Sequence, residues 1–159
     1  MKVLVTTIPF ADKDTRPLHL LEQAGAEVIV NPLGRKFTEA DFAGMITDVD
    51  ILIAGTESIT EAVLGQTSRL KLIARVGIGL DSVDLLAARQ HDVAVSYTPD
   101  APSPAVAELT IGLMIDLLRS VHVSSLQMHQ GQWYRYFGRR LSRATIGIIG
   151  VGRIGARVI

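Results

Sequence analysis

The sequence contains no cysteine. Disulfide bonds and thiolate metal sites are therefore excluded, and no other metal site is expected. No apolar run is long enough to cross a bilayer, and the short apolar start of the chain lacks a small-residue cleavage site. We expect a first strand there, not a signal peptide. A soluble cytoplasmic protein without a membrane partner is the resulting prediction.

Acidic residues are absent after Asp116, whereas seven arginines follow it. One interpretation is a positive potential near a phosphate-bearing ligand. The other is that compensating acids lie on a part of the protein outside this chain. Arg135 lies among the aromatic residues Trp133, Tyr134 and Tyr136, but so short a segment does not indicate a nucleic-acid site, and no nucleic-acid partner is expected.

Short apolar strands and helices alternate through the first hundred residues, which predicts an α/β fold with a parallel sheet covered on both faces. Neither internal repeats nor low-complexity segments are present. Thr15, Thr60 and Asp81 are expected to cap helices, and Thr38 with Asp41 resembles a capping box. The expected strands are 2–8, 27–30, 50–54, 70–74 and 93–96, and the expected helices are 15–25, 38–45, 60–64 and 82–90.

Three prolines in Thr98–Pro104 forbid helix and central strand, so this segment is expected to separate two domains, 1–98 and 99–159. Ser103 is expected to cap a single long helix that ends before Gly131. Between Val106 and Leu118 this helix is apolar almost all round, which predicts burial on more than one side.

The last segment carries a G-x-G-x-x-G motif directly after a predicted strand, Thr145–Ile149. This arrangement is typical of dinucleotide-binding loops. Gly150 allows the tight turn, Gly152 lets the backbone approach a pyrophosphate, and Gly155 lets the following helix pack closely. The alternative is a tight turn without a ligand. The acidic residue that would contact the ribose is expected about 20 residues further on, so the choice between NAD and NADP is open.

A second glycine loop, Gly77-Ile-Gly79, lies between a predicted strand and a predicted helix. Its backbone N–H groups can hold a carboxylate, or the loop can be only a strand-to-helix turn. For Asp81 and Asp84, helix capping is the preferred interpretation.

Three ordered segments, ARVGIGLDSVDLLAA, PDAPSPAVAELTIGLMIDLLR and ATIGIIGVGRIG, resemble the D-isomer-specific 2-hydroxyacid dehydrogenases. The resemblance implies a flavodoxin-like substrate domain, then the start of a Rossmann domain for NAD or NADP. It also implies hydride transfer between the cofactor and a small 2-hydroxy or 2-keto acid. The substrate-binding residues it implies are Val76, Gly77, Ile78 and Gly79. The cofactor-binding residues it implies are Val106, Gly150, Val151, Gly152, Arg153, Ile154 and Gly155.

The sequence departs from the family pattern at two positions. Pro102 stands where many members have asparagine, and Ile78 stands where some have a polar or basic residue. Both changes disfavour a highly charged substrate, but which 2-hydroxy acid is used stays open.

The resemblance places the catalytic arginine, glutamate and histidine beyond Ile159, so the chain alone is expected to be inactive. His19, His91, His122 and His129 are expected to be structural or solvent-facing. A homodimer through the helix 105–130 is also implied. Two alternatives remain: a non-catalytic NAD-binding or dimerisation module of the same fold, and an unrelated Rossmann enzyme, against which the first two segments argue.

Overall fold

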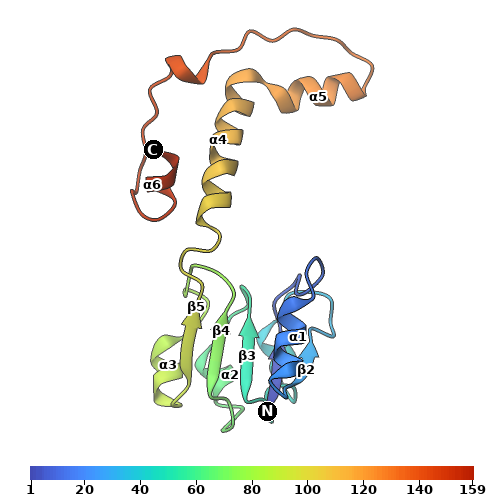
Figure 1. The fold of residues 1–159 in the computed structure, drawn as a ribbon, viewed down its shortest axis with the longest axis vertical. Coiled ribbons are helices and arrows are strands. Elements are labelled where there is room, and N and C mark those ends of the chain that lie inside the picture. Colours follow the sequence, from blue (N-terminus) through green and yellow to red (C-terminus); the bar gives the residue numbers. More distant parts are fainter. The chain divides into compact units, whose positions relative to one another are not determined.

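The computed structural model describes residues 1–159, which divide into two compact units, Met1–Pro99 and Asp100–Ile159. The N-terminal unit is built on five parallel strands in the order β2-β1-β3-β4-β5 (Figure 1). The α/β class and the parallel sheet are confirmed. The strands are β1 (Lys2–Val5), β2 (Glu27–Val30), β3 (Ile51–Ala54), β4 (Leu72–Arg75) and β5 (Ala94–Tyr97).

Strand alternation explains how the sheet is covered. Leu4 in β1, Leu52 in β3 and Ile73 in β4 join one fully buried cluster. The same cluster takes in the 3₁₀ helix η1 (Glu39–Phe42), α2 (Glu61–Leu64) and α3 (Leu85–Gln90). The helix α1 (Arg16–Gln23) contacts β2 and buries none of its side chains. Burying a large apolar side chain contributes about 1.5–3 kcal/mol, so the face of the sheet with η1, α2 and α3 supplies most of the hydrophobic stabilisation.

One predicted helix start is wrong by three residues, and the capping box is confirmed. The Thr38 N–H donates to Asp41 as expected, at 2.7 Å. Helix α3 begins at Leu85, where Asp84 and not Asp81 accepts a hydrogen bond from the backbone of the first turn. Asp81 and Ser82 instead form a turn, closed by the Val83 N–H donating to the Leu80 carbonyl at 2.9 Å. Val83 then pairs with Ile59, which donates to the Ser82 carbonyl at 2.7 Å, so the helix begins only after Asp84.

The C-terminal unit contains α4 (Ser103–Arg119), α5 (Val121–His129), the 3₁₀ turn η2 (Leu141–Arg143) and α6 (Gly155–Val158). The single helix predicted over this region is wrong, because Ser120 adopts φ 53° and separates α4 from α5. Asp116 stabilises the break: its carboxylate accepts from the His122 backbone at 2.7 Å and contacts the His122 ring at 2.8 Å. This carboxylate satisfies a donor that the start of α5 would otherwise leave free.

Two further expectations in this unit are corrected. Ser103 is the first residue of α4 and not its cap; Pro102 precedes the helix, and the buried Ser103 hydroxyl has no hydrogen-bond partner. The segment Thr145–Ile149 forms no strand. A strand is stabilised by pairing with a neighbour, and none lies beside this segment.

Asp50 links the amino-terminal edge of the sheet to the segment before β4, and it yields a pH-dependent prediction. The Arg69 guanidinium, 2.9 Å away, and the Lys2 N–H, 2.6 Å away, lower the pKa of Asp50 from 3.8 to about 2. A lowered pKa stabilises the fold above pH 3.8, and that stabilisation is lost as the pH falls towards 2. Asp50→Asn is therefore expected to lower the urea midpoint at pH 7, with the difference from wild type disappearing near pH 2.

The matched control for this prediction is Asp12→Asn, because Asp12 is exposed and makes no hydrogen bond or ion pair. Its urea midpoint should follow the wild type at every pH. An Asp50→Asn deficit of the same size at pH 7 and pH 2 would show that the ion pair is not its cause.

Candidate functional site

The loop Val76–Gly79 directly follows β4, at the carboxyl edge where the parallel strands end together. Ligands of open parallel sheets bind at this edge. The Val76 N–H donates to the Ala54 carbonyl at 2.8 Å, and the Gly77 N–H donates to the Thr98 hydroxyl at 2.8 Å. The N–H groups of Ile78 and Gly79 donate to no protein group. Of the four predicted substrate-binding residues, these two therefore offer free donors.

Gly77 gives the loop its shape. Its φ of 150° is a conformation that side-chain-bearing residues rarely adopt. The Gly77 carbonyl also accepts from the Thr98 N–H at 3.1 Å, so both polar groups of the Gly77 backbone are hydrogen-bonded to Thr98. Val76 and Gly77 are thus held by the two neighbouring strands, and the free N–H groups follow them.

Arg75 adds a positive charge to this loop that sequence reasoning did not single out. Its guanidinium bends back over Gly77 and donates to the Val76 carbonyl, while its Nε is buried without a partner. Guanidinium groups form strong paired hydrogen bonds with carboxylates. The signal was available in the sequence, since a basic residue at the end of a buried strand directly precedes the glycine loop. The free N–H groups can bind an organic carboxylate, and the Arg75 guanidinium adds a positive charge beside Gly77.

The C-terminal unit contains the second predicted site, the loop Gly150–Gly155. Gly150 adopts φ 89°, and a side chain at Gly155 would begin 2.2 Å from the Gly150 carbonyl oxygen. Both positions therefore require glycine. A side chain at Gly152 would meet no atom within 4 Å, so the space over this residue is open.

The backbone of the glycine loop is available to a ligand. None of the N–H groups from Gly150 to Gly155 donates to another protein group. Val151 and Arg153 are exposed, and Ile154 is half-buried. The loop has the free donors and the open side that a pyrophosphate needs, so its residues fit a dinucleotide cofactor.

Val106, the remaining predicted cofactor residue, lies near the start of α4 and is partly exposed. The short helix α6 packs against α4, and Arg157 of α6 pairs with Asp100 at 2.8 Å. The predicted cofactor residues thus belong to two elements of one unit that are in contact. The predicted substrate loop belongs to the other unit.

The excess of arginine after Asp116 is largely unpaired in the structure. Of the seven arginines, Arg157 alone forms an ion pair with a carboxylate. Arg153 lies in the glycine loop itself, which favours the phosphate interpretation there. No group of three histidine, aspartate or glutamate side chains could hold a metal ion. None of the helices combines the length and the apolar character that crossing a membrane requires.

Comparison with known proteins gives the family. The model of the D-isomer specific 2-hydroxyacid dehydrogenase catalytic domain matches residues 3–152. This chain belongs to that family. The D-3-phosphoglycerate dehydrogenase of Methanocaldococcus jannaschii is 36% identical over 154 residues, which cover 91% of this chain and 28% of that protein.

Two solved structures are also similar. The TT0316 protein of Thermus thermophilus superposes with a TM-score of 0.89 at 33% identity, over 99% of this chain and 51% of its own. The NAD⁺-bound 3-phosphoglycerate dehydrogenase of Entamoeba histolytica superposes with a TM-score of 0.81 at 33% identity, over 99% and 49% of the two chains. The chain therefore spans about a quarter to a half of the length of these relatives.

Proposed function

We propose that the complete protein is an NAD- or NADP-dependent oxidoreductase that acts on a small 2-hydroxy or 2-keto acid. The observation that carries the proposal is the pair of glycine loops, each with free backbone donors, in a chain of this family. The loop Gly150–Gly155 has the geometry for a pyrophosphate, and the loop after β4 has the geometry for a carboxylate. The bound nicotinamide would supply or take up a hydride.

Each loop has a defined task in this proposal. The N–H groups of Gly152 and Arg153 would hold the cofactor phosphates, with Val151 and Ile154 flanking them and Val106 nearby on α4. The N–H groups of Ile78 and Gly79 would donate to the substrate carboxylate, and Arg75 would add charge complementarity. Through the family resemblance, binding of the substrate carboxylate and carbonyl is assigned to an arginine beyond Ile159, and acid–base catalysis to a histidine paired with a glutamate, also beyond Ile159.

The substrate class follows from the two departures from the family pattern. Ile78 in the loop after β4 is apolar, and Pro102 in the C-terminal unit has no side-chain donor, so neither side chain can bind a second anionic group. We therefore propose a small 2-keto acid as the substrate in the reduction direction, in preference to a phosphoester.

Turnover of a substrate panel tests the proposal. The complete protein is expected to oxidise NADH or NADPH in the presence of glyoxylate, pyruvate, hydroxypyruvate or a bulkier 2-keto acid, measured by absorbance at the nicotinamide band. The 159-residue chain alone is expected to show no turnover, because the acid–base groups are assigned to later residues. Failure of every substrate with both cofactors would refute the assignment.

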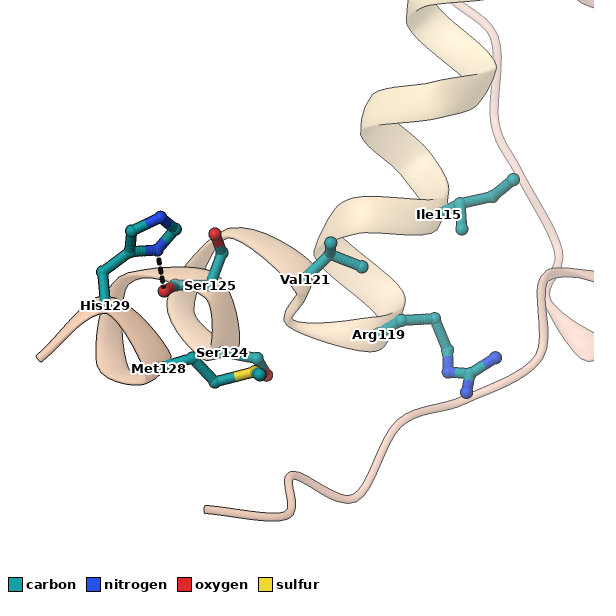
Figure 2. A pocket seen from close by; sticks show the side chains of 7 residues that line it. All are labelled: Ile115, Arg119, Val121, Ser124, Ser125, Met128 and His129. Atoms are coloured by element: carbon teal, nitrogen blue, oxygen red, sulfur yellow. Dashed lines mark hydrogen bonds between the residues drawn. The ribbon is translucent and has the colours of Figure 1, made fainter. Parts of the chain in front are cut away.

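We also propose a homodimer with α4 and α5 at its centre. Both helices expose large apolar side chains; Leu109, Leu113 and Leu117 of α4 are 61%, 52% and 72% exposed. A groove at the junction of α4 and α5 is lined by side chains of both helices, shown in Figure 2. Its lining residues are Ile115, Arg119, Val121, Ser124, Ser125, Met128 and His129. Leaving several such side chains in water costs about 1.5–3 kcal/mol each, and the two-fold dimer is the commonest closed homo-oligomer that could cover them.

Light scattering tests the dimer. The complete protein is expected to have twice its chain mass, and the 159-residue chain is expected to self-associate at micromolar concentrations. Leu113→Glu is expected to shift both towards monomer, because a charge would have to be buried in the interface. Glu22→Lys, a charge change on the exposed helix α1, serves as the control. A well-behaved monomer at micromolar concentrations would contradict the proposal.

A further inference from the structure

Glu57 is a buried carboxylate that neither predicted site accounts for. It follows β3, is 2% exposed and forms no ion pair. One of its oxygens, Oε1, accepts from the Thr6 hydroxyl and from the Gly55 N–H, the latter at 2.8 Å. Burying a charge without a counter-charge is costly, so its hydrogen bonds must be strong for the fold to retain it.

Towards one side of the sheet, Glu57 connects β3 to β1 and β2. Thr6 follows β1, and its carbonyl accepts from the Asn31 side-chain amide at 2.6 Å. Asn31 in turn directly follows β2, and its own oxygen accepts from Leu33 and Gly34 in the next turn. The carboxyl ends of these three strands are therefore joined by side-chain hydrogen bonds that meet at Glu57.

Towards the other side, Glu57 connects to the substrate loop through one peptide group. In the peptide group between Ala54 and Gly55, the N–H donates to the Glu57 carboxylate and the carbonyl accepts from the Val76 N–H, each at 2.8 Å. The next residue, Gly77, is held by Thr98 after β5. Hydrogen bonds thus join each strand end to the next across all five strands, in the spatial order of the sheet.

The peptide group between Ala54 and Gly55 is closely surrounded by side chains. A side chain at Gly55 would begin 2.9 Å from the Thr7 hydroxyl and 3.0 Å from the second carboxylate oxygen of Glu57. Neighbouring side chains therefore restrict the movement of this peptide group, and its N–H and its carbonyl are both hydrogen-bonded. A charged acceptor on its N–H also polarises its carbonyl, which strengthens the bond to Val76.

We infer that Glu57 is a positioning residue for the substrate loop: through the Ala54–Gly55 peptide it fixes Val76, while Thr98 holds Gly77, and it thereby sets the direction of the free N–H groups of Ile78 and Gly79. This role rests on the proposed function, because it assigns those N–H groups to the substrate carboxylate. Glu57 itself does not touch the substrate. Its loss should weaken substrate binding and leave the hydride-transfer step almost unchanged.

Two substitutions of Glu57 in the complete protein test the inference. Glu57→Gln keeps an acceptor of the same shape without the charge, and Glu57→Met removes the acceptor at similar volume. We expect amide hydrogen exchange of the peptide covering residues 72–80, followed by mass spectrometry, to be about tenfold faster in Glu57→Gln, and faster still in Glu57→Met. We expect KM for the 2-keto acid to rise about tenfold in Glu57→Gln, with kcat within twofold of wild type.

Two controls separate positioning from general stability. Glu39→Gln removes an exposed carboxylate that also accepts a threonine hydroxyl, from Thr60 at 2.5 Å, and it should change neither measurement. Val49→Ala makes a cavity in the core away from the carboxyl edge, and it should lower the melting temperature without raising KM.

The results that would refute the role of Glu57 differ from those that would refute the proposed function. A wild-type protein without turnover would refute the proposed function, and the exchange of residues 72–80 would still decide whether Glu57 holds this loop. Exchange and KM within twofold of wild type in Glu57→Gln would overturn the positioning role. So would a Val49→Ala variant whose KM rises as much as that of Glu57→Gln. If Glu57→Met does not fold, Glu57→Gln carries the test alone.

Discussion

A valine at position 152 is expected to abolish binding of NADH and NADPH by the complete protein while its fold stays intact. A side chain at Gly152 meets no atom within 4 Å, so the valine strains nothing in the free protein. It occupies the open side of the loop, where a pyrophosphate would approach the N–H groups. Two lost hydrogen bonds to a charged group are worth roughly 1.5–3 kcal/mol each, which is an affinity loss of about 100-fold or more.

Fluorescence titration with NADH measures this effect, and circular dichroism confirms the fold. Gly155→Ala is the informative comparison, because its methyl group would lie 2.2 Å from a backbone oxygen of Gly150. That variant should lose cofactor affinity and thermal stability together, whereas Gly152→Val should lose affinity alone. Unchanged affinity in a folded Gly152→Val protein would show that the glycine loop is only a turn.

An alanine at position 77 is expected to lower kcat/KM for the 2-keto acid about 10- to 100-fold. The φ of 150° at Gly77 is strained for alanine, and such strain costs roughly 1–3 kcal/mol. The added methyl group would also lie 2.0 Å from an Arg75 nitrogen. The flexible arginine can move away, but the backbone of the loop must then change, and the donors of Ile78 and Gly79 move with it.

Steady-state kinetics of Gly77→Ala measure the loss, with Gly25→Ala as the matched control. Gly25 also has a positive φ, 74°, with open space around it, and it lies after α1, away from the carboxyl edge. Gly25→Ala should cost stability without changing kcat/KM. Wild-type kinetics in Gly77→Ala would mean that this loop does not bind the substrate.

The parallel sheet could be predicted because its information is local. Each strand core is a short apolar run, and Thr38 and Asp41 of the capping box are three positions apart, so neighbouring residues determine both. The glycine loops were also visible, because the positive φ of Gly77 and Gly150 requires a residue type that a sequence displays.

The errors arose where contacts between separate elements decide the local structure. Whether Asp81 or Asp84 caps α3 depends on pairing of the preceding segment with Ile59. The break at Ser120 depends on the Asp116 carboxylate, which turns from one helix to cap the next. A strand at Thr145–Ile149 would need a neighbouring strand, which apolar residues alone do not supply.

The same reason limited the prediction of the candidate site. A sequence names the loop residues but does not say which N–H groups the protein itself uses. Val76 and Gly77 donate to the neighbouring strands, which leaves Ile78 and Gly79. Nothing in the sequence indicated a role for Glu57, because that role depends on hydrogen bonds to Thr6 and Gly55, which follow two different strands.

The most direct test of the proposed reaction follows the hydride itself. The complete protein would be given NADH with deuterium at both C4 positions and a 2-keto acid that it reduces, and the product would be analysed by mass spectrometry and chiral chromatography. We predict the D-2-hydroxy acid with one deuterium at C2. A product with hydrogen at C2, or no 2-hydroxy acid from any 2-keto acid with either cofactor, would contradict hydride transfer by this protein.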